Sequence, residues 1–439
     1  MKKRMILALL LATVLLLSGC SLRTIDQMYC LPKRSESYQD LQRVIDQAMV
    51  GKEYSAPLSG ENRQTVQLAD LDGDGEQEYL LFARSSSEKP LQILIFGRVE
   101  GEYVLIDTVD GSGSYFDMVE YIQMDEKPGL EMVVGRQLSD QVLRSVSIYS
   151  MRDGSAQQLV STNYTKFLTC DLDVDGQSEV MVLRPGLSET DNGVAELYTM
   201  VNGNVERSNE AVMSGPTDRL RRIILGKLHG GQPAVFVGTT VEESALITDI
   251  YALVDGHFTN VSLSNESGTS VQTLRNYYVY AEDIDNDGEV ELPDLITMRS
   301  MESERNLSRR YLIRWYAMAV NGSEITKMHT YHNYVGGWYL ELDAAWASRI
   351  SVVHRDNACD FYLWDSKNQQ ADKVFTVYAL TGQDREEQAV TENRFVLHRS
   401  ESTVYAAHME VASGLMEISR EDMIAGFHLI RQDWKTGEM

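Results

Sequence analysis

The sequence predicts an all-β fold, a β-propeller of six to seven four-stranded blades with a short helix at each end. Three observations support this prediction. An acidic loop that runs directly into an apolar strand occurs three times, beginning at Asp70, Asp171 and Asp283. A strand–turn–strand pattern with a glycine in the turn occurs six times, and the repeats are not interrupted by helical periodicity. About four short strands in each unit of roughly 50 to 65 residues are typical of propeller blades, and a β-sandwich array is the alternative.

The first 19 residues predict a lipoprotein signal peptide. Lys2, Lys3 and Arg4 precede the apolar run MILALLLATVLLL, and the segment ends LLSGC, with small residues before Cys20. A basic start followed by a short apolar run is typical of a secretory signal, and the alternatives to a lipoprotein signal are an ordinary secretory signal or a short membrane anchor. The ending resembles a bacterial lipobox, whose cysteine becomes the lipidated first residue of the mature protein. We therefore expect lipidation (palmitate) at Cys20, a tether over residues 20–35 and a location on the extracytoplasmic face of the cell membrane.

Composition limits the partners of the mature chain. The formal net charge is −25, and loss of the three cations of the signal peptide makes it −28 for residues 20–439. This acidity argues against nucleic-acid binding and suits a surface that is exposed to divalent cations.

The cysteines of the mature chain are few. After Cys20, only Cys30, Cys170 and Cys359 remain. An odd number of scattered thiols is not a disulfide framework, so we expect no bridge, and one pair among the three is the alternative.

Residues 36–439 are expected to form a single domain, with blades over about 60–412. The six hairpin turns are centred on glycines, and four of them are Asp-Gly or Asn-Gly pairs, the strongest short-range hairpin signal. These glycines are Gly101, Gly154, Gly203, Gly256, Gly322 and Gly382. Apolar residues at helical spacing predict a helix over 37–50 and another over about 419–435, which Ser419 can cap. Both helices are expected to cover the edge of the ring.

The three acidic loops share the pattern Asp-x-Asp-x-Asp-Gly-x-x-Glu. Oxygen ligands at alternate positions suit Ca²⁺, which takes 6–8 oxygens, and the glycine at position 6 permits a sharp turn. An EF-hand also requires a glutamate at position 12 and flanking helices. Position 12 is occupied here by Leu81, Val182 or Asp294, and strands are expected on the flanks. The closing carboxylate is therefore the glutamate at position 9.

The loops resemble those of FG-GAP and VCBS repeats, which build integrin-α-like β-propellers. In that family calcium is bound by the side chains at positions 1, 3, 5 and 9 and by the carbonyl at position 7. The resemblance is limited to the three loops, since the Phe-Gly…Gly-Ala-Pro signature is absent from the sequence. It implies up to three structural calcium ions, held by Asp70, Asp72, Asp74 and Glu78 with the Glu76 carbonyl, by Asp171, Asp173, Asp175 and Glu179 with the Gln177 carbonyl, and by Asp283, Asp285, Asp287 and Glu291 with the Glu289 carbonyl.

The sequence contains no recognisable catalytic motif. His329 and His332 lie three residues apart without the glutamate of a zinc protease helix, and neither a nucleophile elbow nor a glycine-rich phosphate loop is present. One aromatic stretch can be interpreted either as core or as a surface that stacks on a ligand. The candidate ligand-binding residues in this stretch are Tyr331, Tyr334, Trp338 and Tyr339.

We therefore expect a lipid-anchored, calcium-binding, non-catalytic module that binds or scaffolds at the cell surface. It is expected to be a monomer with a protein or glycan ligand. One alternative is a surface enzyme that acts on polysaccharide or peptide, for which acids and a histidine converging in one pocket would be evidence. Another is an accessory subunit of an envelope assembly, for which an exposed apolar patch would be evidence.

Overall fold

The computed structural model describes residues 36–431 apart from short gaps at 139–142, 153, 187–190, 242–244, 277–278, 300–309, 366–369 and 411–417. The predicted signal peptide, Cys20, the tether and Cys30 lie outside the described residues. Within the described part of the chain, no helix is long and apolar enough to cross a membrane. Cys170 and Cys359 are buried, free thiols, so these two do not form a bridge with each other.

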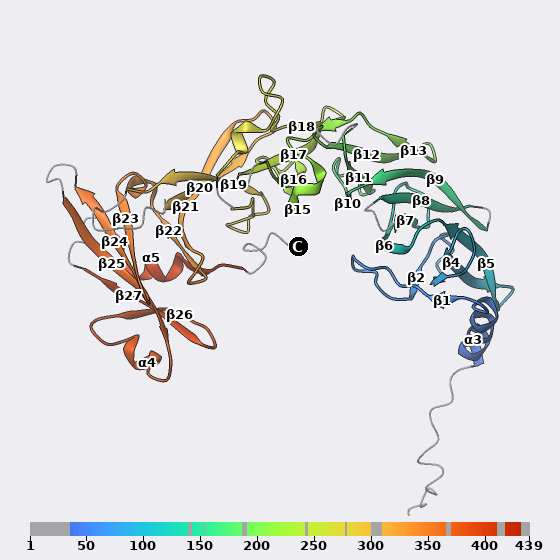
Figure 1. Cartoon of the computed structure of the whole chain (residues 1–439), viewed down its shortest axis with the longest axis horizontal. Coiled ribbons are helices and arrows are strands. Elements are labelled where there is room, and N and C mark those ends of the chain that lie inside the picture. Colours follow the sequence, from blue (N-terminus) through green and yellow to red (C-terminus); the bar gives the residue numbers. More distant parts are fainter. Residues whose placement is uncertain are drawn as a thin grey trace, which may run out of the picture.

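The described residues fold into six antiparallel sheets that follow one another in sequence and lie side by side along an arc (Figure 1). The first sheet contains β1 (Glu53–Tyr54), β2 (Val66–Ala69), β3 (Glu78–Arg84), β4 (Leu91–Val99) and β5 (Glu102–Gly111). The second contains β6 (Tyr115–Ile122), β7 (Glu131–Gln137), β8 (Arg144–Arg152) and β9 (Ser155–Tyr164). The third contains β10 (Lys166–Cys170), β11 (Glu179–Arg184), β12 (Val194–Val201), β13 (Asn204–Arg207) and β14 (Ala211–Val212).

The second half of the arc continues the pattern. The fourth sheet contains β15 (Leu220–Lys227), β16 (Pro233–Thr240), β17 (Leu246–Val254) and β18 (His257–Asn260). The fifth contains β19 (Glu291–Thr297), β20 (Tyr311–Met318), β21 (Glu324–Asn333), β22 (Trp338–Leu342) and β28 (Phe427–Leu429). The sixth contains β23 (Ile350–Arg355), β24 (Ala358–Asp365), β25 (Gln370–Thr381), β26 (Phe395–Arg399) and β27 (Thr403–Met409). Three short 3₁₀ helices are η1 (Thr217–Arg219), η2 (Val271–Thr273) and η3 (Ala344–Trp346).

Five of the six predicted glycine turns join neighbouring antiparallel strands. In the β4–β5 turn, Glu100 and Gly101 have φ values of 54° and 88°. Positive φ at both central residues identifies a type I′ turn, whose twist matches that of the strands. The sixth turn differs, because after Gly382 the chain forms α4 (Arg385–Gln388) and β26 before β27 returns to pair with β25. The segment that could have formed a seventh blade therefore belongs to the sixth sheet.

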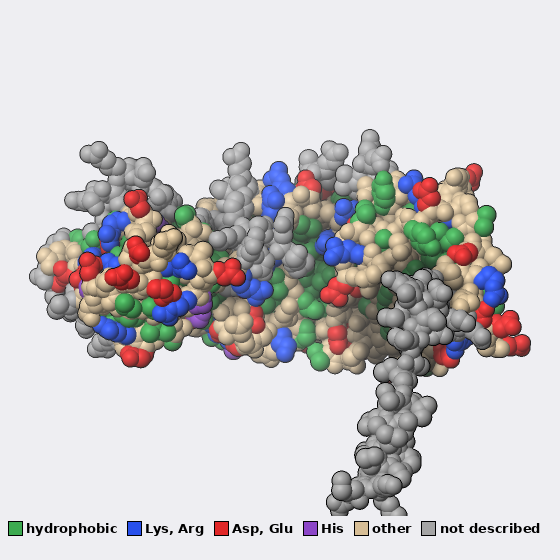
Figure 2. Space-filling view, turned by 90° about the horizontal axis from the view of Figure 1, so that it is seen from below, with side chains coloured by type: hydrophobic (Ala, Val, Ile, Leu, Met, Phe, Trp, Pro, Cys, Tyr) green, Lys and Arg blue, Asp and Glu red, His purple; other side chains and the backbone are tan. Residues whose placement is uncertain are grey.

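The apolar core lies between consecutive sheets. Strand β7 illustrates this arrangement, because Met132 and Val134 pack toward the first sheet whereas Val133 packs toward the third. Alternate side chains of a strand point to opposite faces, so the second sheet is apolar on both sides. Equivalent clusters fill the boundaries between the third and fourth, fourth and fifth, and fifth and sixth sheets. Seen from the edge, the arc is a slab on which acidic and basic side chains are interspersed (Figure 2).

The structure differs from the predicted closed ring at the two ends of the arc. Helix α3 (Glu36–Ala48) buries Leu41 and Ile45 against Leu81 and Phe96, on the face of the first sheet that points away from the second. At the other end, Ala389, directly after α4, packs on the outer face of the sixth sheet with Leu380, Val404 and Ala406. In a closed propeller these two faces would pack on each other. The first face is covered by α3 and the other carries Ala389 of its own sheet's connection, so the two faces do not meet and the sheets form an open arc (Figure 1).

The C-terminal helix is shorter than predicted. Helix α5 (Arg420–Ala425) begins with the predicted Ser419 cap, which forms a capping box with Asp422. It ends at Gly426, and β28 then pairs with β22 as a fifth strand. The ring of Phe427 lies 5.5 Å from that of Trp338 in a stacked arrangement. The apolar residues after Gly426 therefore pack from a strand, and residues 432–439 lie outside the described part of the chain.

Candidate metal sites

The three acidic loops occupy the same position in their sheets. The first joins β2 to β3, the second joins β10 to β11, and the third leads into β19 after a bridge between Glu282 and Glu291. Acids of the first and second loops line open cavities of about 630 and 460 Å³. A small cation can therefore reach these carboxylates from solvent.

The backbone of each loop wraps around its first aspartate. Asp70 accepts hydrogen bonds from the amides of Gly73 (2.8 Å) and Gly75 (3.0 Å). Asp171 and Asp283 accept the equivalent bond from the glycine at position 6, at 3.1 and 3.0 Å. The glycine has a positive φ in all three loops, which a side chain would disfavour. The repeated sequence pattern therefore produces one repeated backbone conformation.

The glutamate at position 9 is buried beneath each loop. Glu78, Glu179 and Glu291 are 3%, 5% and 0% exposed, and each accepts a hydrogen bond from the amide at position 2. Burial raises the pKa of each carboxyl, and the neighbouring aspartates add to the effect. The pKa of Glu179 rises to about 7 and that of Glu291 to about 8. A cation in the loop would offset this electrostatic cost.

The second loop brings together all four side chains predicted to bind calcium. One oxygen from each of Asp171, Asp173, Asp175 and Glu179 lies within 4.8 Å of the others. Oxygens on opposite sides of one Ca²⁺ are about 5 Å apart, since each lies 2.3–2.6 Å from the ion. The carboxylates of this loop are therefore spaced to share one calcium ion.

The first and third loops converge less completely. Asp70, Asp72 and Glu78 form a group within the same 4.8 Å limit, whereas Asp74 lies outside it. In the third loop, the group consists of Asp283, Asp285 and Glu291, and Asp287 belongs instead to a second group with Glu289 and Glu291. The backbone carbonyl oxygens of Glu76, Gln177 and Glu289 remain predicted calcium ligands.

A lysine from the same sheet contacts two acids of the third loop. Lys327 Nζ on β21 lies 2.5 Å from Asp287 Oδ2 and 2.9 Å from Glu289 Oε2. Glu289 Oε2 is also 3.0 Å from His229 Nδ1, and its Oε1 accepts a hydrogen bond from the amide of Gly230. Burial of Glu289 opposes ionisation, but these partners outweigh burial and lower its pKa to about 2. The side chain of Glu289 thus joins the fifth sheet to the fourth.

The two carboxylate oxygens of Glu291 indicate whether the third loop suits a cation. Its Oε2 accepts the amide hydrogen bond from Ile284 at 3.1 Å, but Oε1 is buried and has no hydrogen-bond partner among the described residues. A buried oxygen without a donor costs free energy, commonly about 1–3 kcal/mol. Calcium coordinates such carboxylate oxygens, so the donor set of this loop fits the ion.

Sequence reasoning missed a fourth copy of the position-9 glutamate, in the loop of the second sheet. Glu131 accepts hydrogen bonds from the amide of Met124 and from the hydroxyl of Ser150, both at 3.0 Å. Position 5 of this loop is Lys127, whose ammonium lies 4.0 Å from Asp125. Glu131 stands eight residues after Gln123, and alignment of that spacing with the other loops would have identified it. The glutamate at position 9 therefore accepts a hydrogen bond from the loop backbone even where a lysine replaces the aspartate at position 5.

The loops also connect neighbouring sheets. The amide at position 8 donates to the carbonyl at position 1 of the preceding loop, as in Leu130 to Asp70 (2.9 Å) and Ser178 to Gln123 (2.7 Å). The same bond joins Val290 to Lys227 at 2.9 Å. Each such bond links two sheets through a residue next to acidic side chains, so ordering a loop also orders a boundary between sheets.

The predicted aromatic binding residues are mostly core. Tyr331, Trp338 and Tyr339 are 2%, 1% and 5% exposed, and Tyr334 packs next to this group at an intermediate exposure. Buried rings cannot stack on a ligand, so the binding interpretation is wrong for the first three. Trp346, at the end of the same stretch, is only partly buried.

Trp346 lines a cavity of about 920 Å³ between β21, β22, η3 and α5. His329 also lines this cavity and is 8% exposed. Burial and the charge of Arg314 lower the pKa of His329, although Asp343 opposes them. The acidic lining residues are Glu341, Asp343 and Asp422.

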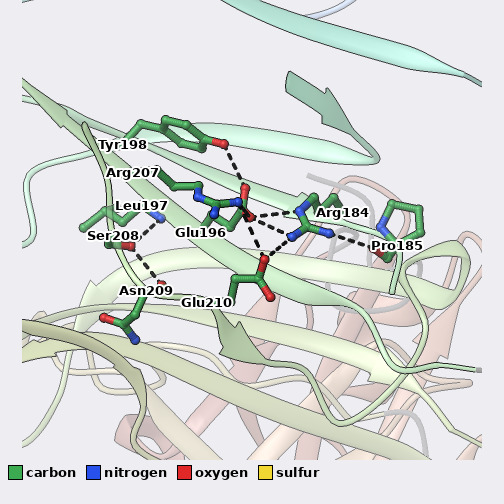
Figure 3. Close-up of polar contacts among 9 residues, drawn as sticks. All are labelled: Arg184, Pro185, Glu196, Leu197, Tyr198, Arg207, Ser208, Asn209 and Glu210. Carbon is green, nitrogen blue, oxygen red and sulfur yellow. Dashed lines mark hydrogen bonds and ion pairs between the residues drawn. The ribbon is translucent and has the colours of Figure 1, made fainter. Parts of the chain in front are cut away.

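A second cluster of charges, in the third sheet, is structural. Glu196 on β12 is fully buried and accepts hydrogen bonds from Arg184 at 2.8 and 2.9 Å and from Arg207 and Tyr198 at 2.8 Å each (Figure 3). Glu210 lies beside both arginines. Burial opposes ionisation of Glu196, but its hydrogen bonds and the two positive charges outweigh burial and lower its pKa. Three side chains therefore bond to the carboxylate of Glu196, and Glu210 pairs with two of them.

Comparisons with known proteins do not place the chain in a family. No family model and no curated protein matches it. Among solved structures, the rhamnogalacturonan lyase YesW aligns at 12% identity and a TM-score of 0.32, over 72% of this chain and 53% of its own length. The exotype rhamnogalacturonan lyase YesX aligns at 12% identity and 0.31, over 75% and 67%. The Dos1 propeller aligns at 8% identity and 0.27, over 70% and 78%. At these scores the alignments carry no conclusion about fold or function.

Proposed function

We propose that the protein is a calcium-stabilised, non-catalytic module of propeller-like sheets that binds or scaffolds a partner. The observation that carries the proposal is the convergence of the four carboxylates of the second loop within 4.8 Å. The resemblance of the loops to FG-GAP and VCBS repeats adds support. Hydrogen bonds beside the loops join neighbouring sheets. An ion that orders a loop would therefore stabilise the boundary between two sheets. Anchoring through Cys20 on the extracytoplasmic face, and a protein or glycan partner, belong to the same proposal.

Calorimetric titration of the purified chain with calcium tests this function. We expect saturable uptake, and the double substitution Asp171→Asn and Asp173→Asn should remove one binding event, because it takes two charges from the second loop. Asp110→Asn on β5, outside the loops, is the matched control and should leave every event in place. Absence of calcium uptake by the unsubstituted chain would refute the proposed sites.

A surface enzyme that acts on polysaccharide or peptide is the second candidate. The observation that favours it is the cavity beside Trp346, which collects His329 with three acids. Burial and the charge of Arg314 lower the pKa of His329, which favours the neutral imidazole that a general base requires. Carboxylates next to an aromatic ring are also suited to binding a sugar or peptide without chemistry, so activity must be measured directly.

For this candidate we expect release of reducing ends or of free amines from a polysaccharide or protein substrate. His329→Gln should reduce the rate by about 10²-fold or more, the usual contribution of a general acid or base. His257→Gln, in an exposed hairpin, is the control and should retain the rate. No turnover, or equal rates for the two variants, would argue against an enzyme at this cavity.

A further inference from the structure

The third acidic loop differs from the first two because an ammonium group lies against it. Lys327 Nζ contacts both Asp287 and Glu289, at 2.5 and 2.9 Å, and its side chain is 18% exposed. Among the ion pairs of the described residues, none includes an acid of the first or second loop. Arg98 lines the cavity of the first loop, but within the described part of the chain only the third loop has a cation in ion-pair contact with its acids.

The lysine holds one of the carboxylates that calcium would need. Asp74, at the same position of the first loop, also lies outside its group, but it has no ion-pair partner among the described residues. In the second loop the aspartate at position 5 lies in one group with those at positions 1 and 3. In the third loop Asp287, which pairs with Lys327, lies outside the group of Asp283, Asp285 and Glu291. Glu291 nevertheless leaves a buried Oε1 without a partner in that group. The loop thus retains three acids and a buried oxygen that suit a cation, while its fourth acid is held by the lysine.

We propose that Lys327 is an internal competitor that makes the third loop take up calcium at a higher concentration than the first two. The inference rests on the proposed calcium-binding function. Asp287 has to leave the ammonium to join the other ligands, and two cations a few ångströms apart repel each other. Both effects weaken calcium binding. Because Glu289 also contacts His229 of the fourth sheet, calcium uptake by this loop acts at the boundary between the fourth and fifth sheets.

Calorimetric calcium titration of the full chain and its Lys327 variants tests the proposal. The unsubstituted chain should show two tight events and one weak event, and the pair Asp283→Asn and Asp285→Asn should remove only the weak one. Lys327→Met should raise the weak affinity by roughly 5- to 150-fold, the range of ordinary coupling between sites. Lys327→Arg keeps the charge and should leave the weak affinity unchanged. Lys373→Met is the matched control, because this lysine pairs with Asp360 and Glu410 in the sixth sheet.

The outcomes separate this inference from the proposed function. Three equal events in the unsubstituted chain, or an unchanged weak event in Lys327→Met, would overturn the role of Lys327 and leave calcium binding intact. No uptake in any variant would overturn both. If Lys327→Met does not fold, Lys327→Gln removes the same charge and decides the question in the same way.

Discussion

Calcium is expected to raise the thermal unfolding midpoint of the protein by about 5–10 °C, and a chelator should reverse the increase. An ion that binds only the folded state at 100 times its dissociation constant stabilises that state by about 2.7 kcal/mol, so two filled loops supply roughly 5 kcal/mol. The effect should be concentrated at the sheet boundaries, because Asp70 of the first loop and Ser178 of the second both form hydrogen bonds across a boundary. Thermal melts followed by circular dichroism, with and without calcium, measure the shift.

Variants in which one loop has lost two of its aspartates show whether the calcium-dependent increase in the unfolding midpoint arises from the loops. The double substitution Asp171→Asn and Asp173→Asn should remove about half of the calcium-dependent increase. Asp125→Asn, in the second sheet's loop with the internal Lys127, should leave the increase intact. Magnesium at the same concentration controls for screening of the large negative charge, since it prefers a smaller octahedral site. An equal shift in all variants, or with magnesium, would mean that calcium acts through general screening.

The local structure of the repeats could be predicted from the sequence because it depends on neighbouring residues. The Asp-Gly turn at Asp255 and Gly256 has positive φ at both residues, as the residue pair requires. The acidic pattern likewise fixes a loop in which position 1 accepts backbone amides and position 9 lies buried. Alignment by spacing alone would also have found Glu131, whose loop lacks most of the aspartates.

The arrangement of the sheets could not be predicted, because it depends on contacts between distant segments. The apolar stripe of α3, with Leu41 and Ile45, indicates that the helix is buried but not which face it covers. That face, with Leu81 and Phe96, is the one a closed ring would use. Lys327 is 40 residues from Asp287 in the sequence, and the pairing of β19 with β20 and of β20 with β21 brings them together. The competitor for calcium therefore depends on the fold and not on the motif.

Loss of the buried carboxylate of Glu196 is expected to be the largest effect of a single substitution. Glu196→Ala should lower the free energy of unfolding by about 3–5 kcal/mol, because it leaves the charges of Arg184 and Arg207 without their buried partner. The carboxylate is fully buried, whereas the side chains of the two arginines are 19% and 51% exposed. Chemical denaturation followed by tryptophan fluorescence measures the change.

Glu210→Ala is the matched control within the same cluster. Glu210 contacts both arginines but is 44% exposed, and exposed ion pairs contribute about 0–1 kcal/mol.

The pH dependence of stability provides a second test of the role of Glu196. The pKa of Glu196 is lowered in the folded state, so its contribution is present above the ordinary glutamate pKa of about 4.3 and is lost as the pH falls through the lowered value. The difference in stability between the unsubstituted chain and Glu196→Gln should therefore shrink at low pH. Equal costs for the Glu196 and Glu210 substitutions, or a difference that does not change with pH, would show that the buried charge is not what the arginines stabilise.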